Sequence, residues 1–526
     1  MASFLDSIGY NQWVLPALLL IPVVGAVIVL LLPARAPADP TTAVETTAAR
    51  QVAFWFFVLE FVVSLGLWWS FNPSDTGWQA AVDTAWIPSW GARFTLGVDG
   101  IALMMILLTT FIMPLSVLGS WTSIRTKVRS FYALLLILTT GMLGVFVARD
   151  LFLFYVMWEV MLVPMYFIIG IWGGERRIYA SIKFFIYTML PSLLMLVAII
   201  YLGLHARTAA GTPDFSYDHL LGIGGDIPQQ AALWLFAAFF LAFAVKVPMF
   251  PFHTWLPDAH VEAPTAGSVI LAGIMLKMGT FGFLRFALPL FPGTAMNPTV
   301  RMVILLLAVI GIIYGALVAM VQPDFKKLVA YSSVSHLGFV MLGIFALTLQ
   351  SVQGALMVMI NHGISTGALF LLVGVIYERR HSRLIESYGG IARVVPMFAA
   401  ILTFVSLSSI GLPGTNGFVG EFLVLIGSFR TYPVLTIIAT TGVIFAAVYL
   451  LWAIQRILFN PLDKGDNVHL PDLNRRELAL MLPFIAAIIW LGIYPAPVLR
   501  RMEGSAQLLV HRVESSTSTR VGDATR

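Results

Sequence analysis

Long apolar stretches recur along almost the whole chain and constrain its fold more than any other feature. A helix that crosses a membrane needs about 20 mostly apolar residues. About fourteen such stretches can be marked, at residues 13–33, 51–70, 97–119, 131–148, 151–173, 183–204, 231–251, 264–290, 300–321, 325–347, 351–377, 396–430, 433–459 and 477–495. We therefore expect an all-α polytopic membrane protein. Only 11% of the 526 residues are charged, which excludes a soluble enzyme, a disordered chain and a nucleic-acid-binding protein.

The distribution of basic residues predicts the orientation of the chain. Eighteen of the 31 Lys and Arg residues fall in loops that follow odd-numbered stretches, and six fall in loops that follow even-numbered ones. Cytoplasmic loops carry an excess of Lys and Arg. The odd-numbered loops are therefore expected in the cytoplasm and both termini on the outer side. The polar tail, residues 500–526, shows no apolar period, and we expect it to be disordered.

Five ionisable residues interrupt the apolar stretches. They are Glu60, Glu159, Lys246, Lys277 and Glu421. A charged side chain at the bilayer centre costs about 2.5–3.5 kcal/mol on insertion scales, so such residues persist where they pair or face a water-filled path. A buried ion pair that locks two helices is one interpretation, and a proton path is the other. Glu60 has no polar neighbourhood, which favours a packing or interface role.

Four histidines lie in or near the apolar stretches. His336 and His362 belong to polar segments, Tyr-Ser-Ser-Val-Ser-His and Asn-His-Gly-Ile-Ser-Thr. They can form a proton relay, because imidazole changes charge near neutral pH. Ligation of a haem by both rings and simple hydrogen bonding between helices are the alternatives. His253 and His260 flank a proline-rich break and are either mouth residues of a path or plain interfacial residues.

Two stretches are interrupted in their middle, at residues 246–257 and 408–417. Proline removes a backbone donor and breaks a helix, and a pair of interrupted helices at corresponding places indicates inverted repeats with an ion site at the breaks. The breaks fall in stretches seven and twelve, which predicts five-helix repeats of stretches 4–8 and 9–13. The expected divisions are 1–130, 131–290, 300–460 and 461–526, the last holding the final helix and the polar tail.

Several motifs carry a resemblance to a known family. They are Val98-Asp-Gly-Ile-Ala, Trp158-Glu-Val-Met-Leu-Val-Pro-Met-Tyr, the long run from Lys246 to Thr265, Leu328-Val-Ala-Tyr-Ser-Ser-Val-Ser-His-Leu-Gly, Asn361-His-Gly and Gly417-Phe-Val-Gly-Glu. With them the chain resembles, over about residues 95–460, the antiporter-like subunits of respiratory complex I, NADH:quinone oxidoreductase. Glu421 favours the M type, because the sister subunits L and N usually carry Lys there.

The resemblance implies a role for each buried group. Glu159 is expected to be the acidic partner of Lys246, the pumping lysine, and Lys277 to be the central connecting lysine. His336 and His362 are then relay residues, and Glu421 is the site on the exit side. The implied function is proton translocation in the bacterial plasma membrane, driven by quinone reduction elsewhere in the complex, with no redox chemistry in this chain.

The resemblance also implies cofactors and partners. FMN, iron–sulfur clusters and quinone are expected on other subunits, which agrees with the absence of cysteine here. Expected partners are other membrane subunits, especially L and N, and lipids, but no nucleic acid. Alternatives that remain are a subunit of a multisubunit cation/proton antiporter or membrane-bound hydrogenase, a haem-bearing electron carrier, and a scaffold whose buried charges are structural.

Overall fold

The computed structural model describes residues 1–33, 43–208, 211–224 and 227–524. Within them, thirteen helical segments are long and apolar enough to cross a membrane. They are α2 (Tyr10–Leu31), α3 (Ala43–Ser70), α4 (Gly100–Gly119), α5 (Val128–Val147), α6 with α7 (Leu151–Val160, Leu162–Trp172), α8 (Arg177–His205), α10 (Gln229–Lys246), α12 with α13 and α14 (Thr265–Ile270, Leu276–Gly282, Leu288–Leu290), α16 (Pro298–Met320), α17 (Phe325–Ala346), α18 (Leu349–Arg380), α21 (Pro433–Ile454) and α22 (Arg475–Ile493).

The remaining elements are shorter or lie outside the spans. They are α1 (Ala2–Ser7), β1 (Gln79–Ile87), β2 (Ala92–Val98), α9 (Tyr217–Ile223), α11 (Trp255–Glu262), α15 (Pro292–Ala295), α19 (Pro396–Ile410), α20 (Asn416–Phe429) and α23 (Ala496–Ala524). The apolar helices α19 and α20 follow one another and together fill the stretch predicted at 396–430. The all-α polytopic membrane fold is thus confirmed, and the inverted repeats stay a prediction.

Both predicted helix breaks are present. α10 ends at Lys246 and α11 begins only at Trp255, whose indole Nε1 donates to the carbonyl of Val245 at 2.8 Å. The last carbonyls of a helix have no donor within the helix, and at membrane depth they need another hydrogen-bond partner. The indole of Trp255 provides that partner at the end of α10. α19 ends before Gly411, which has a positive φ of 89°, a conformation that glycine adopts without steric cost.

Two further spans are irregular, which the sequence analysis did not predict. Residue Met161 separates α6 from α7, and the carbonyl of Val160 has no α-helical donor because Pro164 lacks an N–H. The span between Thr265 and Leu290 contains two π-helical turns, at Leu271–Met275 and Phe283–Ala287. Such turns are rare and frequently mark functional sites.

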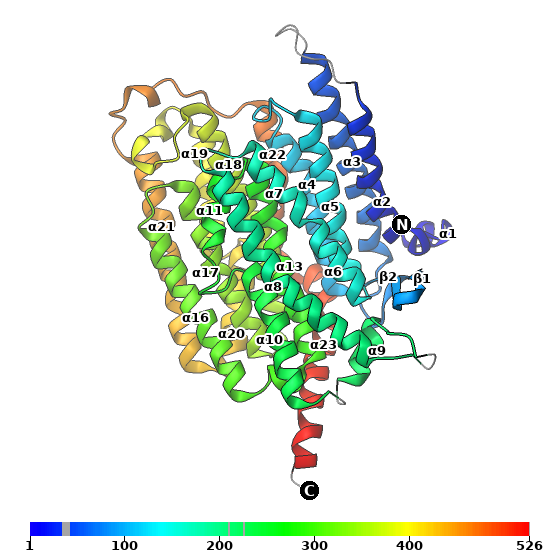
Figure 1. Cartoon of the computed structure of the whole chain (residues 1–526). Helices are drawn as coiled ribbons and strands as arrows, with labels where there is room; N and C mark the ends of the chain where they lie inside the picture. Colours follow the sequence, from blue (N-terminus) through cyan, green and yellow to red (C-terminus); the bar gives the residue numbers. More distant parts are fainter. Residues whose placement is uncertain (34–42, 209–210, 225–226, 525–526) are drawn as a thin grey trace.

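The connection at 71–96, expected only to be extramembrane, forms the antiparallel hairpin β1–β2 (Figure 1). In the hairpin the Arg93 Nε donates to the Asp83 carboxylate at 2.7 Å, and this contact lowers the pKa of Asp83. The backbone N–H of Arg149 donates to the Thr95 carbonyl at 2.8 Å, which ties the hairpin to the start of α6. We call this side of the molecule the hairpin end.

The odd-numbered connections lie together at the opposite side, which we call the loop end. Hydrogen bonds join them: the Arg50 guanidinium donates to the Ile124 carbonyl at 2.6 Å, and the Phe325 N–H donates to the Arg383 carbonyl at 2.9 Å. Figure 1 shows this end at the top, with the chain terminus of α23 at the bottom. The first odd connection lies partly in residues 34–42, outside the described residues.

The polar tail is a helix, so the prediction of disorder from residue 500 is wrong. α23 begins at Ala496 and buries Val498, Met502, Leu509 and Val513, which recur at helical spacing. The Cβ of an alanine at Gly100 would lie 2.0 Å from the Arg501 carbonyl, so α4 and α23 are in close backbone contact. The apolar stripe is narrow, and the charged and small residues around it hid the helical period.

Candidate functional site

Lys277 occupies the centre of the molecule, on α13, and is fully buried. Its Nζ lies 2.6 Å from Nδ1 of His362 and also donates to the backbone carbonyl of Ala272. Ala272 lies in the π-helical turn that precedes α13, where the wider turn changes the usual i−4 pairing of carbonyls. In its charged form Lys277 can only donate, so in that state Nδ1 of His362 accepts and its Nε2 carries the proton.

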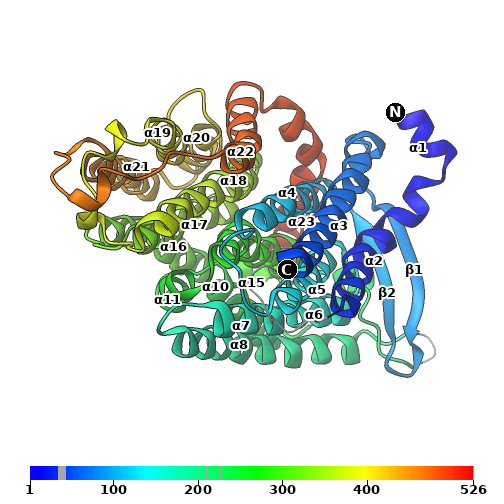
Figure 2. The same cartoon turned by 90° about the horizontal axis from the view of Figure 1, so that it is seen from above.

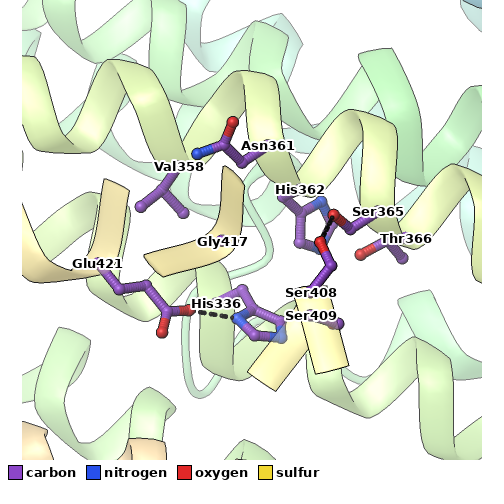
Figure 3. Close-up of a pocket in the computed structure, with 10 residues that line it drawn as sticks. All are labelled: His336, Val358, Asn361, His362, Ser365, Thr366, Ser408, Ser409, Gly417 and Glu421. Carbon is purple, nitrogen blue, oxygen red and sulfur yellow. Dashed lines mark hydrogen bonds and ion pairs between the residues drawn. The ribbon is translucent and has the colours of Figure 1, made fainter. Parts of the chain in front are cut away.

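The contacts continue from His362 to Glu421 (Figure 3). The rings of His362 on α18 and His336 on α17 have centroids 5.7 Å apart. Nδ1 of His336 lies 2.7 Å from Oε1 of Glu421 on α20. When Glu421 is ionised its carboxylate only accepts, so Nδ1 of His336 is then the donor. These four side chains, Lys277, His362, His336 and Glu421, are called the central row below.

A small cavity of about 20 Å³ adjoins the central row. Its lining is rich in polar groups: His336, Asn361, His362, Ser365, Thr366, Ser408, Ser409 and Glu421, with Val358 and Gly417. A space of this size in polar surroundings holds about one water. The Nε2 atoms of both histidines have no hydrogen-bond partner among the described residues. One water here would be able to connect the Nε2 atoms of His336 and His362 by hydrogen bonds.

The break between α19 and α20 sets the position of Glu421. The Asn361 side chain donates to the Asn416 carbonyl at 2.5 Å, and the Asn416 Oδ1 accepts from Ser408 at 2.6 Å. A Cβ on Gly417 would lie 2.0 Å from the Ser408 carbonyl, so the two half-helices meet with no room for a side chain. Glu421 follows one helical turn later and is thereby aimed at His336.

Glu159 and Lys246 form a second group, one helix away from the central row. The Ser192 hydroxyl donates to Glu159 Oε1 at 2.5 Å. The buried Lys246 ammonium lies 5.3 Å from the Trp158 ring centroid and 5.6 Å from that of Phe184, a cation–π arrangement. The carboxylate thus hydrogen bonds to serine rather than directly to Lys246, although its charge acts on the ammonium.

Of the other singled-out residues, Glu60 and His260 are fully buried. Both Glu60 oxygens and both His260 nitrogens lack a hydrogen-bond partner among the described residues. His260 stacks on Phe370 with a centroid distance of 4.7 Å. His253 is also buried, and its ring centroid lies 5.0 Å from that of Tyr314.

The sequence analysis assigned no role to Lys326, Ser192 or Asn416. Lys326 is one of the eighteen basic residues assigned above to odd-numbered loops, yet it is buried on α17 and its Nζ donates to the Ala263 carbonyl at 2.6 Å. It lines a cavity of about 220 Å³ at the loop end, and an adjoining polar cavity of about 470 Å³ shares Glu262 and Arg383 with it. Ser192 could have been singled out from the sequence, because it is a polar residue inside an apolar stretch.

Haem does not fit between His336 and His362. Nδ1 of each ring is already in contact, with Glu421 and Lys277 respectively, and the space beside the rings has room for about one water, not a porphyrin. Among the described residues no group of three or more His, Asp or Glu side chains could hold a metal ion. The arrangement brings a lysine, two imidazoles and a carboxylate together in one buried row.

Comparison with known proteins decides the family. The family model described as "NADH:quinone oxidoreductase/Mrp antiporter, TM" matches residues 148–446, which include the whole central row. The chain belongs to this family. Its similarity to "NADH-quinone oxidoreductase subunit M" of Rhodobacter capsulatus is 46% identity, over 90% of this chain and 92% of that protein. The family resemblance expected from the motifs is therefore confirmed.

Solved structures of the family share the fold. A chain of respiratory complex I from Thermus thermophilus with bound NADH superposes with a TM-score of 0.84 at 32% identity, covering 95% of this chain and 99% of that one. A chain of the Mrp complex from Dietzia sp. DQ12-45-1b gives a TM-score of 0.77 at 20% identity, covering 96% of this chain and 56% of that one. The second likeness shows the fold alone.

Proposed function

We propose that the chain is the M-type antiporter-like subunit of an NADH:quinone oxidoreductase and translocates protons through its buried Lys, His and Glu side chains. The observation that carries this proposal is the central row, in which Lys277 contacts His362 and His336 contacts Glu421 inside the membrane domain. The similarity to subunit M of Rhodobacter capsulatus supports the assignment to this complex.

The central row can pass a proton because each imidazole has two nitrogens. His362 takes a proton on Nδ1 from Lys277 and releases one from Nε2 toward the small cavity. His336 takes it on Nε2 and releases one from Nδ1 to Glu421. Each transfer leaves the imidazole as its other tautomer, and rotation of the ring or exchange of its proton must restore the first tautomer before the next transfer.

The Glu159–Lys246 group is proposed to control when a proton enters the row. Movement of an opposite charge from about 6 Å to a distant position changes the electrostatic energy of an ammonium by about 3 kcal/mol at an effective dielectric of about 20. Transfer of one charge against 100 mV requires about 2.3 kcal/mol. The energy change that a shift of Glu159 causes at Lys246 is therefore large enough to move one charge against about 100 mV.

The remaining parts of the proposal concern the surroundings of the chain. FMN, iron–sulfur clusters and quinone belong to other subunits, and quinone reduction there supplies the energy. The neighbours are the sister subunits L and N and membrane lipids. The loop end faces the bacterial cytoplasm and both termini lie on the outer side, because the loop end carries the excess of Lys and Arg.

Purification of the intact complex through a tag on this chain tests the proposal. Mass spectrometry of the purified assembly is expected to identify the NADH-oxidising and quinone-reducing subunits. Copurification with cation/proton antiporter or hydrogenase subunits only would contradict it. That alternative is not favoured, since the similarity to the Mrp chain is 20% identity and that to the subunit M relative is 46%.

A further inference from the structure

An apolar groove lies between the N-terminal helices and α22, away from the central row. Figure 2 shows α3 and α22 on either side of α4. Side chains of α3, α4, α18, α22 and the start of α23 line a cavity of about 560 Å³ there, among them Phe61, Trp68, Phe111, Ala487 and Trp490. The volume is in the range of pockets that bury a small organic molecule.

Aromatic contacts mark the two ends of this groove. Toward the middle of the membrane, Phe111 packs edge-to-face on Phe484 at 5.6 Å and lies 6.1 Å from Phe61. Toward the hairpin end, Trp68 and Trp490 meet edge-to-face at 6.0 Å. Phe61 and Trp68 are seven positions apart, which is about 10 Å along a helix. Trp at one end and Phe at the other place the groove in one leaflet, since Trp prefers the membrane interface.

Arg501 lies at the interfacial end of the groove. Its guanidinium carbon stacks 3.6 Å from the Trp68 ring centroid. Nε and Nη2 donate to the Trp68 carbonyl at 3.2 and 3.0 Å, and Nη1 donates to the Pro497 carbonyl at 3.1 Å. Of the five N–H groups of arginine, one on Nη1 and one on Nη2 remain, and this pair is the fork that binds phosphate or carboxylate with two parallel hydrogen bonds.

No carboxylate competes for that fork among the described residues, where Arg501 forms no ion pair. Asp99, at the start of α4, is paired with Arg285 at 2.6 Å, and Glu503 on α23 is exposed and accepts from Gln507. Arg500, beside Arg501, is exposed and adds a second positive charge. The end of the groove is therefore positively charged and can take up an anion.

We propose that the groove binds one anionic phospholipid, with an acyl chain against α3, α4 and α22 and the phosphate on the free fork of Arg501. The apolar lining inside the membrane requires a hydrocarbon, and the fork requires an anionic oxygen group, so a phospholipid satisfies both. The lipid fills the gap that α3 and α22 leave over α4, and it connects the N-terminal helices to the C-terminal ones. A helix of a neighbouring subunit would meet the apolar lining but leave the fork without an anion.

Photo-crosslinking on the intact complex tests this proposal. Phosphatidylglycerol and phosphatidylcholine that carry a diazirine in one acyl chain are exchanged into the purified complex, and the crosslinked peptides are identified by mass spectrometry. Phosphatidylglycerol is expected to crosslink to 61–69 and 483–491 in preference to phosphatidylcholine. An interfacial Arg contributes about a fivefold preference for anionic lipid, so Arg501→Gln should remove about that factor.

Three variants separate the parts of the proposal. Arg501→Lys should keep part of the preference, because it keeps the charge without the fork. Ala487→Leu should reduce crosslinking of both lipids at the groove, because it fills apolar space. Arg430→Gln, an exposed arginine at the hairpin end, should change nothing. Equal crosslinking of both lipids in the wild-type complex, an unchanged preference in Arg501→Gln, or exclusion of both lipids by a neighbouring subunit would overturn the proposal.

Discussion

At the scale of single residues, the buried ionisable side chains differ in whether they have a partner. Lys277, His336 and Glu421 have hydrogen-bond or ion-pair contacts within the central row, whereas the Glu60 oxygens have none among the described residues. The sequence could reveal each of these residues, because a charge in an apolar stretch is conspicuous. It could not reveal which of them meet, since that depends on how α13, α17, α18 and α20 pack.

Lys246 is expected to be required for pumping although it makes no direct contact with the central row. Lys246→Ala should lower quinone-dependent NADH oxidation and proton pumping by about a hundredfold or more, the lower end of what a positioned proton-transfer group contributes, while the complex still assembles. Glu159→Gln should act in the same direction. Rates are measured in membrane vesicles and normalised to assembled complex, with Lys464→Ala in a loop as the control. Wild-type rates in an assembled Lys246→Ala complex would make this residue structural.

Glu60 is expected to be dispensable for turnover. Glu60→Gln removes an ionisable group that is buried without a partner, and burial of such a group is costly. The variant should pump at the wild-type rate, and its complex should unfold at the same temperature or higher in a thermal melt. Loss of pumping in an assembled Glu60→Gln complex would instead place Glu60 on a proton path.

At the scale of elements, runs of proline and glycine predicted the two long helix breaks. They did not predict the interruption at Met161 or the π-helical turns. The runs around Pro248 and Pro413 predicted interruptions, and α10 and α19 do end there. The π-helical turn that frees the Ala272 carbonyl for Lys277 contains no proline and only the single Gly273, and it packs against α18 and α4. The helical period of α23 was missed because its buried stripe is narrow.

The tight junction of α19 and α20 gives a prediction at this scale. Gly417→Ala would place a Cβ 2.0 Å from the Ser408 carbonyl, so α20 must shift, and overpacking of this kind costs about 1–3 kcal/mol. Because Glu421 lies on the same helix, pumping should fall even though every ionisable residue is present. Gly465→Ala, where a Cβ meets nothing within 4 Å, is the control. Unchanged pumping in Gly417→Ala would mean that the break does not set the position of Glu421.

At the scale of the whole molecule, the two ends differ in charge and in structure. The loop end collects most loop Lys and Arg residues and carries the two polar cavities, and the hairpin end carries β1–β2 and the proposed lipid groove. The count of apolar stretches predicted the membrane fold, which is confirmed, whereas the orientation inferred from the loop charges stays a prediction. The hairpin was beyond such reasoning, because the count considered only stretches long enough to cross the membrane as helices, and the strands of 9 and 7 residues are too short for that.

Cysteine labelling tests the orientation, since the chain has no cysteine of its own. Glu386→Cys lies on the exposed loop end and Thr76→Cys on the exposed hairpin side. In intact cells a membrane-impermeant maleimide should label Thr76→Cys and leave Glu386→Cys unlabelled until the membrane is opened. The reverse pattern would invert the assignment of the two ends and with it the direction of the proton path.

Proton pumping by Glu421 variants tests the central claim most directly. Glu421→Gln keeps the size of the side chain and can still contact His336, but it cannot ionise or take up a proton. Glu421→Lys restores a titratable group of the kind expected in the sister subunits. The measurement is quinone-dependent NADH oxidation together with acidification in membrane vesicles, normalised to assembled complex. We predict strong inhibition in Glu421→Gln and partial activity in Glu421→Lys. Full pumping by an assembled Glu421→Gln complex would contradict a proton path that ends at this carboxylate.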